Sequence, residues 1–177
     1  MAVDERVLRF FSGEGTDSRG RPLGQILNWS DDELERTHDF IQWLFPLVEP
    51  SGFNVHAPVL DDRTIQKFLA EDKFRQSLRT ALIRMLGFYG LEIVRDMPLR
   101  VDRKLHFAER ARNWITFGNH NHLRITRILK SLRLLGLEPE AAAFFVCLAD
   151  IYRDESAKKS PGISEDTFNF WRLAAKV

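Results

Sequence analysis

Five histidines and one cysteine are the side chains of this sequence that could ligate a transition metal. His120 and His122 lie two positions apart, a spacing that brings both side chains to one side only in an extended backbone. A zinc site needs further ligands of this kind, and neither a cysteine pair nor a His-Glu-x-x-His spacing is present. The other candidates are His38, His56, His106 and Cys147. We therefore expect no metal and no cofactor.

The run Asn119-His120-Asn121-His122 stands at the start of a predicted helix. Its amide and imidazole groups suit capping of that helix and hydrogen bonds to the preceding loop. The same groups can also meet an anion at a helix N-terminus, where free N–H groups favour negative charge. We expect the capping role, and keep all four residues as candidate ligand-binding residues.

A second candidate cluster is His38, Gln42 and Trp43. His38 falls on the apolar face of a predicted helix together with Ile41, and Gln42 follows about one turn later. A histidine in such a stripe is more often a hydrogen-bonded core residue than a catalytic base. Trp43 points to the opposite face, so this helix is expected to be central. These three residues join the predicted ligand-binding set.

No nucleophile is evident in the sequence. Cys147 lies within the apolar stretch 143–148, which is typical of a small buried hydrophobe. No Ser-His-Asp, Cys-His or paired-carboxylate arrangement can be defended from spacing. We therefore expect a protein that is not an enzyme.

The elements that would position these residues are helices. Residues 121–135 have apolar residues in one arc and basic residues over most of the rest, with Asn121 as the predicted N-cap and Gly136 just beyond the end. Arg124 and Arg127 are expected to be exposed on this helix, and both are candidate ligand-binding residues.

Other signals complete the predicted architecture. Ser30 and Glu33 form a capping box that opens a helix expected to run to Phe45 and to stop at Pro46. Residues 91–101 are the one stretch with strand character, an edge strand or an extended arm because of Pro98. The sequence thus predicts an all-α fold, with residues 1–177 as a single compact multi-helix domain.

Composition limits the setting and the partners. A single cysteine forms no intramolecular disulfide, and neither a targeting signal nor a membrane-length apolar run is evident, so we expect a cytoplasmic protein. Residues 1–62 carry five arginines against twelve acids, a net charge of −7, and residues 95–133 carry ten basic residues against three acids, a net charge of +7. The two parts either face each other or are solvated, or the basic part is a surface for phosphates, RNA or an acidic peptide.

Three sequence blocks resemble the opioid growth factor receptor family. They are residues 34–50, which contain His-Asp-Phe-Ile-Gln-Trp-Leu-Phe-Pro; residues 85–90, Met-Leu-Gly-Phe-Tyr-Gly; and residues 113–138, which contain Asn113-Trp114 and the basic helix. The resemblance covers roughly residues 10–171. It implies a non-catalytic domain of a peptide receptor, whose animal members are described as binding an enkephalin and carry long additional regions. The chain departs locally, at His122 and in the 92–104 connection.

Three functions remain in competition. The resemblance and the absence of catalytic motifs favour a binding module for a peptide or protein segment. The +7 region favours, as an alternative, binding of a nucleic acid or other anionic phosphate ligand through helix 121–135. The third is an unrecognised enzyme that uses His38 or His120 as acid or base. No membrane insertion is expected, and the oligomeric state is left open.

Overall fold

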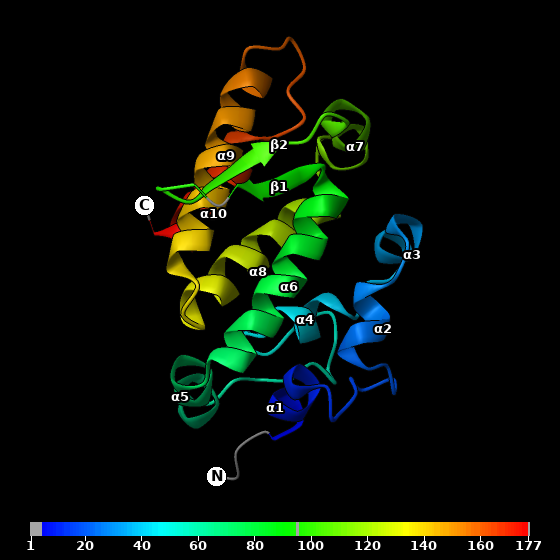
Figure 1. Cartoon of the computed structure of the whole chain (residues 1–177). Coiled ribbons are helices and arrows are strands. Elements are labelled where there is room, and N and C mark those ends of the chain that lie inside the picture. The colour runs from blue at the N-terminus through cyan, green and yellow to red at the C-terminus, as the bar shows by residue number, and fades with distance from the viewer. Residues whose placement is uncertain (1–4, 95, 177) are drawn as a thin grey trace. The chain divides into compact units, whose positions relative to one another are not determined.

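A computed structural model of the chain describes residues 5–94 and 96–176 (Figure 1). These residues form ten helices and one two-stranded sheet, which confirms the predicted mostly helical fold. The elements are α1 Glu5–Ser12, α2 Leu23–Leu27, α3 Asp31–Arg36, α4 Ile41–Leu44, α5 Asp62–Ala70, α6 Asp72–Tyr89, β1 Leu91–Val94, β2 Arg100–Arg103, α7 Phe107–Trp114, α8 His120–Leu134, α9 Glu138–Ser156 and α10 Glu165–Ala175.

The chain divides into two compact units. The N-terminal unit comprises Met1–Leu82 with Leu134–Gly136, and the C-terminal unit comprises Ile83–Arg133 with Leu137–Val177. Each unit is described by itself below. The prediction that residues 1–177 form one domain stays a prediction.

Aromatic side chains build the core of the N-terminal unit. Phe10 packs edge-on against Trp43, with ring centroids 5.4 Å apart, and Phe11 packs against Phe68 at 4.9 Å. Phe68 in turn contacts Phe74, at the start of α6. Helices α1, α4, α5 and α6 therefore meet around one dry aromatic cluster.

The predicted helix from Ser30 to Phe45 is wrong in its second half. The capping box is present, with Ser30 Oγ accepting from the Glu33 N–H and Glu33 Oε2 accepting from the Ser30 N–H at 2.7 Å. The helix ends at Arg36, however, and a new short helix, α4, begins at Ile41. Every residue from 40 to 47 is buried, and a helix that turned only one face to the core could not bury eight consecutive side chains.

A chain of buried hydrogen bonds connects the helices of the C-terminal unit. Trp114 of α7 donates its indole N–H to the Tyr89 carbonyl at the end of α6, and the Trp114 carbonyl contacts His122 Nε2 of α8 at 2.9 Å. Trp171 of α10 donates to the His122 carbonyl and packs its ring edge-on against the imidazole. Each of these groups is buried and bonded, so the chain fixes four helices relative to one another.

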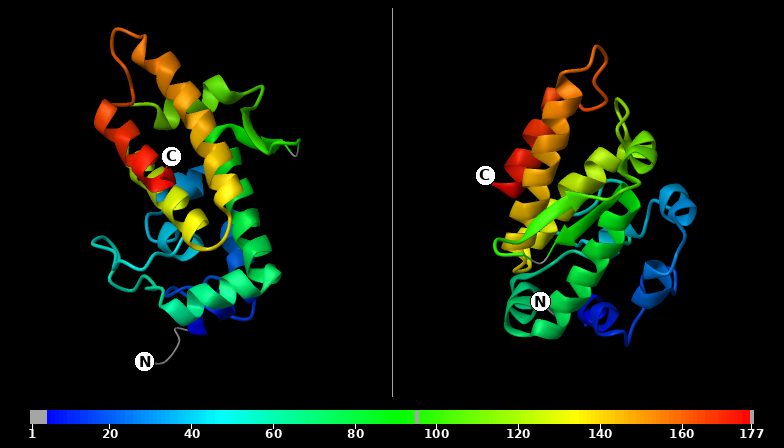
Figure 2. Two further views of the ribbon diagram at one scale, coloured as in Figure 1. Left: turned by 90° about the vertical axis from the view of Figure 1, so that its left-hand side faces the viewer. Right: turned by 45° about the horizontal axis from the view of Figure 1, so that its top comes forward.

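The segment with strand character forms a hairpin. β1 and β2 pair in antiparallel register, Leu91 opposite Arg103 and Ile93 opposite Val101. Pro98 lies in the connection between the strands, so the predicted single edge strand is a two-stranded sheet. The hairpin lies against α9, and α10 packs alongside that helix (Figure 2).

Candidate functional site

Two cavities that share Arg103 border α9 in the C-terminal unit and together form a groove along this helix. Within each cavity, the α9 residues of the floor are mostly spaced three or four positions apart, so they share one side of the helix. The walls of the groove are β2, on one stretch of the helix, and α7, on the next. The lining side chains from α9 are Pro139, Ala142, Ala143, Val146, Cys147, Asp150 and Arg153 on the first stretch, followed by Ile151, Asp154 and Glu155 on the second. Lys158, just beyond the end of α9, also lines the second stretch.

The first stretch is a cavity of about 880 Å³ between β2 and α9. Small and aliphatic side chains form its floor, and Val146 remains 59% exposed there. Residues 98–103 form its other wall, and no residue of β1 lines it. An exposed apolar surface with room above it is typical of a binding groove.

The thiol in this groove is unreactive. Cys147 is buried, and burial raises its pKa to about 12, which outweighs the opposite effect of Arg103. The thiolate is the nucleophilic form, so a thiol with this pKa is protonated at neutral pH. The interpretation of Cys147 as a small buried hydrophobe is confirmed.

Charged residues of both signs border the apolar floor. On the hairpin, Arg100 pairs with Asp102 at 3.2 Å and with Asp96 at 3.3 Å. On α9, Arg153 pairs with Asp150 at 2.7 Å. These pairs are partly exposed, so they contribute little to stability.

An ion pair separates the first stretch from the second. Arg103 Nη2 lies 2.6 Å from Asp154 Oδ2, and the guanidinium stacks over the ring of Phe107 at 5.1 Å. The Arg103 guanidinium lowers the pKa of Asp154 below its usual range, so this pair is charged at neutral pH. Arg103 lines both cavities and is the residue that divides the groove.

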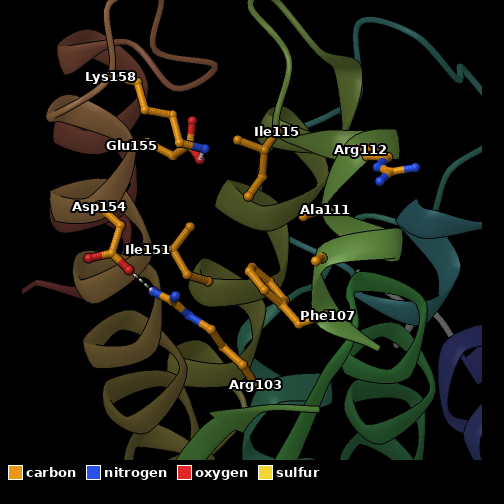
Figure 3. A pocket seen from close by; sticks show the side chains of 10 residues that line it. Arg103, Phe107, Ala111, Arg112, Ile115, Ile151, Asp154, Glu155 and Lys158 are labelled. Carbon is orange, nitrogen blue, oxygen red and sulfur yellow. Dashed lines mark hydrogen bonds and ion pairs between the residues drawn. The ribbon is translucent and has the colours of Figure 1, made fainter. Parts of the chain in front are cut away.

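The second stretch is a cavity of about 400 Å³ between α7 and α9 (Figure 3). Phe107, Ile115 and Ile151 give it an apolar interior, while Lys158 and Glu155 lie at one end. Glu155 is buried and accepts from Lys158 Nζ and, at 3.4 Å, from the Gly162 N–H. This carboxylate therefore holds the loop between α9 and α10 against the cavity.

The predicted residues of the N-terminal unit have different environments. His38 is exposed in the loop between α3 and α4, so its placement on an apolar helix face is wrong, because the helix ends before it. Gln42 and Trp43 are buried, and within the described residues Gln42 Oε1 and Trp43 Nε1 have no hydrogen-bond partner. Burial leaves neither side chain a surface for a ligand in this structure.

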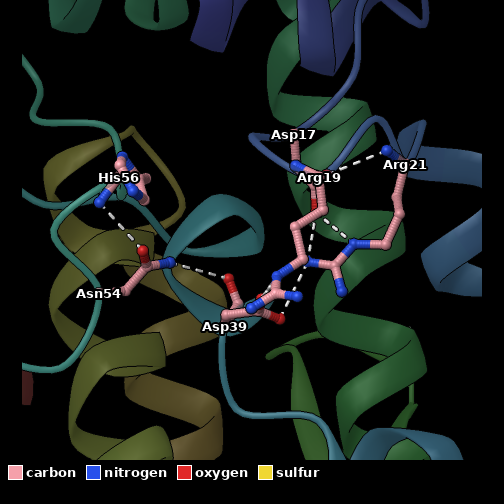
Figure 4. A network of polar contacts seen from close by, with 6 residues as sticks. All are labelled: Asp17, Arg19, Arg21, Asp39, Asn54 and His56. Carbon is pink, nitrogen blue, oxygen red and sulfur yellow. Dashed lines mark hydrogen bonds and ion pairs between the residues drawn. The ribbon is translucent and has the colours of Figure 1, made fainter.

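Asp39, which follows His38, belongs to a polar network (Figure 4). Buried Asp17 accepts from Arg21 Nε at 2.6 Å, and Arg21 Nη2 lies 2.9 Å from Asp39 Oδ1. Arg19 also pairs with Asp39, whose backbone carbonyl accepts from Asn54 Nδ2. Part of the −7 charge of residues 1–62 is thus balanced within the same segment, and the turn-rich stretch 12–20 is fixed by ion pairs.

The predicted ligand-binding residues at the start of α8, residues 119–122, mainly make contacts within the protein. Asn119, not Asn121, is the capping residue: its Oδ1 accepts from the Asn121 N–H, and its Nδ2 donates to the Asn113 carbonyl. Asn121 and His122 are buried, whereas His120 is half-buried. The interpretation that these residues cap the helix and bond the preceding loop is confirmed for Asn119, which also donates to Thr116 Oγ1, whereas His122 bonds the last residue of α7.

The expected exposure of the α8 arginines is wrong for Arg124. It is 5% exposed, and its Nη1 donates to Asn121 Oδ1 at 3.0 Å. Arg127 is half-buried, and Arg133 donates to the Ala174 carbonyl of α10. Ile125, Ile128, Leu129 and Leu132 are buried, as the predicted apolar arc requires, while Leu123 lies outside that arc and 61% of its surface is exposed.

The described residues hold no group of three or more His, Cys, Asp or Glu side chains arranged to bind a metal ion. Across the same residues, no helix has the length and apolar character needed to cross a membrane.

Comparison with known proteins identifies the family. The model of the opioid growth factor receptor conserved region matches residues 7–176. The chain belongs to the opioid growth factor receptor family. It is 37% identical over 155 residues to the opioid growth factor receptor of Homo sapiens, and 38% identical over 155 residues to that of Mus musculus. It is 40% identical over 122 residues to opioid growth factor receptor-like protein 1 of Rattus norvegicus.

The shared part is most of this chain and a small part of the relatives. The first two alignments cover 85% of the chain but 22% and 24% of the relatives, and the third covers 66% of the chain and 25% of the relative. The chain thus spans about a quarter of the length of these family members. No solved structure matches it.

The groove was not foreseen from the sequence of this family member. Its floor comes from a helix whose interior stripe, which includes Phe144 and Leu148, is buried, and the groove uses adjacent positions of the same helix. The run Ala141-Ala142-Ala143 and the apolar Val146 were the available signal, because small residues on a helix let another chain approach closely.

Proposed function

We propose that this member of the opioid growth factor receptor family is a non-catalytic module that binds a protein segment in the groove along α9. The observation that carries the proposal is the cavity of about 880 Å³ between β2 and α9, with an apolar floor and a rim of charged residues. The named relatives are receptors, which agrees with binding of a ligand or protein.

The chemistry of the groove supports binding and gives no means of catalysis. Its thiol has a pKa of about 12, and its carboxylates Asp102, Asp150 and Asp154 are engaged with arginines. A bound segment would place apolar side chains against Ala142 and Val146 and polar groups against the rim. Burial of apolar area would supply affinity, and the rim would select among segments.

The structure weakens the alternative of nucleic-acid binding through α8. Phosphate contacts require arginines that reach the surface, whereas Arg124 is buried against Asn121 and Arg133 is bonded to α10. At these two positions, the basic side chains of α8 therefore bond other residues of the C-terminal unit.

Selection from a random peptide library displayed on phage tests the proposed function. Peptides enriched on the wild-type protein are expected to lose at least about tenfold in affinity on Val146→Glu, which puts a charge on the apolar floor. Leu173→Glu is the matched control, because Leu173 is an exposed leucine of α10 outside the groove. Failure to enrich any peptide on folded protein, or equal loss on both variants, would overturn the proposal.

A further inference from the structure

The outer edge of β2 carries backbone groups that point away from β1. The Lys104 N–H donates to the Gly90 carbonyl at 2.9 Å, which makes these two residues a hydrogen-bonded pair of the hairpin. Hydrogen-bonded and non-bonded pairs alternate along antiparallel strands. The N–H and C=O groups of Val101 and Arg103 therefore point outward, whereas those of Arg100 and Asp102 point to β1.

These outward groups have no partner within residues 5–94 and 96–176. Val101 is nevertheless only 5% exposed. Backbone groups in such a setting are normally paired, and the unpaired edge of a strand is a template for another strand. The cavity of about 880 Å³ flanks this edge, because β2 residues of both alternating sets line it and β1 residues do not.

Side chains next to this edge favour one sequence in a segment that pairs with β2. Arg100 and Asp102 lie on one face of β2 and bond each other at 3.2 Å, and Val101 between them points to the other face, where α9 packs. Opposite charges directly across two strands stabilise a sheet, and like charges destabilise it. An antiparallel segment thus fits best with an acid opposite Arg100, an aliphatic residue opposite Val101 and a base opposite Asp102.

We propose that β2 binds its partner by strand addition: an extended protein segment containing a basic, an aliphatic and an acidic residue in succession pairs antiparallel with residues 100–103. This inference rests on the proposed function and names its recognition mode. The aliphatic side chain of the segment packs beside Val101 on the small residues Ala142, Ala143 and Val146. Main-chain bonds to Val101 and Arg103 give affinity, and the charged pairs set orientation and register.

The test uses the capped peptide acetyl-Thr-Arg-Val-Asp-Thr-amide and its reversed counterpart, acetyl-Thr-Asp-Val-Arg-Thr-amide, titrated into the wild-type protein by NMR. Only the Arg-Val-Asp peptide makes two opposite-charge pairs with Arg100 and Asp102 of β2, so it is expected to bind roughly fivefold more tightly than the reversed peptide. The double variant Arg100→Asp with Asp102→Arg exchanges the two charges, and it is expected to reverse this preference. Equal affinity of the two peptides for the wild type would overturn the proposal.

N-methylation separates strand addition from side-chain binding without any change to the protein. A methyl group on the valine nitrogen removes the peptide N–H that faces Val101, and the expected loss in affinity is about tenfold. A methyl group on the aspartate nitrogen, which points away from β2, is expected to leave the affinity unchanged.

Three outcomes have defined meanings. Equal affinity of both N-methyl peptides would overturn strand addition, while library peptides that need Val146 would still uphold the proposed function. A stable dimer in sedimentation that the Arg-Val-Asp peptide does not dissociate would place a second copy of the chain on the edge, and it would also overturn the proposal. Slower exchange of the Val101 and Arg103 amide protons on adding the peptide would support it.

Discussion

Trp114 illustrates how a single residue connects several helices of the C-terminal unit. Its ring is fully buried against Tyr89, its indole N–H bonds the end of α6, and its carbonyl meets His122 of α8. Loss of its side chain would therefore remove the packing and the indole hydrogen bond together, while the backbone carbonyl would remain.

We predict that Trp114→Ala lowers the free energy of unfolding by about 3–5 kcal/mol, the range for a large buried aromatic residue. Leu123→Ala on α8 is the control and should change it by less than about 0.5 kcal/mol, since this leucine is largely exposed. Urea denaturation followed by circular dichroism measures both. An unchanged midpoint for Trp114→Ala would show that α7 does not pack as described.

His122 makes stability depend on pH. Burial lowers the pKa of this imidazole below its ordinary value and His120 adds to the effect, while the hydrogen bond with the Trp114 carbonyl opposes it. In the unfolded chain the ring takes up a proton near pH 6.5, whereas in the folded chain it stays neutral to lower pH. The unfolded state then binds more protons, so the folded state loses stability as the pH falls below about 6.5.

We expect His122→Gln to reduce the loss of unfolding free energy between pH 7.5 and pH 5.5, because glutamine does not titrate. The comparison requires urea titrations of both proteins at each pH, and His38→Gln controls for loss of an imidazole at an exposed position. If His122→Gln and the wild type lose stability in parallel, the buried neutral imidazole is not the cause.

Single residues also show how far sequence reasoning reaches at this scale. The burial of Cys147 and Ile128 followed from their apolar neighbours. The burial of Arg124 did not follow, because an arginine in an amphipathic pattern is expected at the surface and only the tertiary structure supplies Asn121 as its partner. A buried charge is retained where a specific hydrogen-bond partner exists, and one sequence does not reveal that partner.

At the scale of elements, helix ends were predicted correctly where a nearby serine or glycine in the sequence caps the helix. Ser30 caps its helix as predicted, Ser164 caps α10 in the same way, and Gly136 adopts the left-handed conformation just past α8, with φ of +82°. The break between α3 and α4 was missed because residues 37–40 contain no glycine or proline that would signal the end of a helix. The groove was missed because α9 has two apolar faces and only one belongs to the core.

The connection between α9 and α10 supplies a test at this scale. A Cβ at Gly162 would lie 2.4 Å from the Ile115 carbonyl oxygen, a backbone atom that cannot easily move. Gly162→Ala is therefore expected to destabilise the fold by about 1–3 kcal/mol. Gly24→Ala is the control, since Gly24 is in helix α2 with nothing near its added Cβ, and it should be neutral or stabilising. Equal melting temperatures for the two variants would contradict the close packing of this loop on α7.

At the scale of the whole molecule, the opposite charges of residues 1–62 and 95–133 do not by themselves indicate a nucleic-acid partner. Arginines 19 and 21 balance acids of their own segment, and Arg103 pairs with Asp154. The charge asymmetry along the sequence is thus partly removed by pairs within each unit.

We predict that the protein binds a random 20-nucleotide RNA only weakly at 150 mM salt, with a Kd above about 10 µM, the range of non-specific association. Fluorescence anisotropy at several salt concentrations measures it. Submicromolar binding that weakens steeply with salt, and that Lys130→Glu abolishes, would instead support the α8 surface.

The central claim is that a protein segment binds in the groove along α9, and mapping a library-selected peptide by NMR tests it most directly. Backbone amide shifts are expected to concentrate in residues 98–103 and 139–154. Shifts that concentrate instead in residues 38–43 or 119–127 would contradict the claim, and would return the site to the residues first suggested by the sequence.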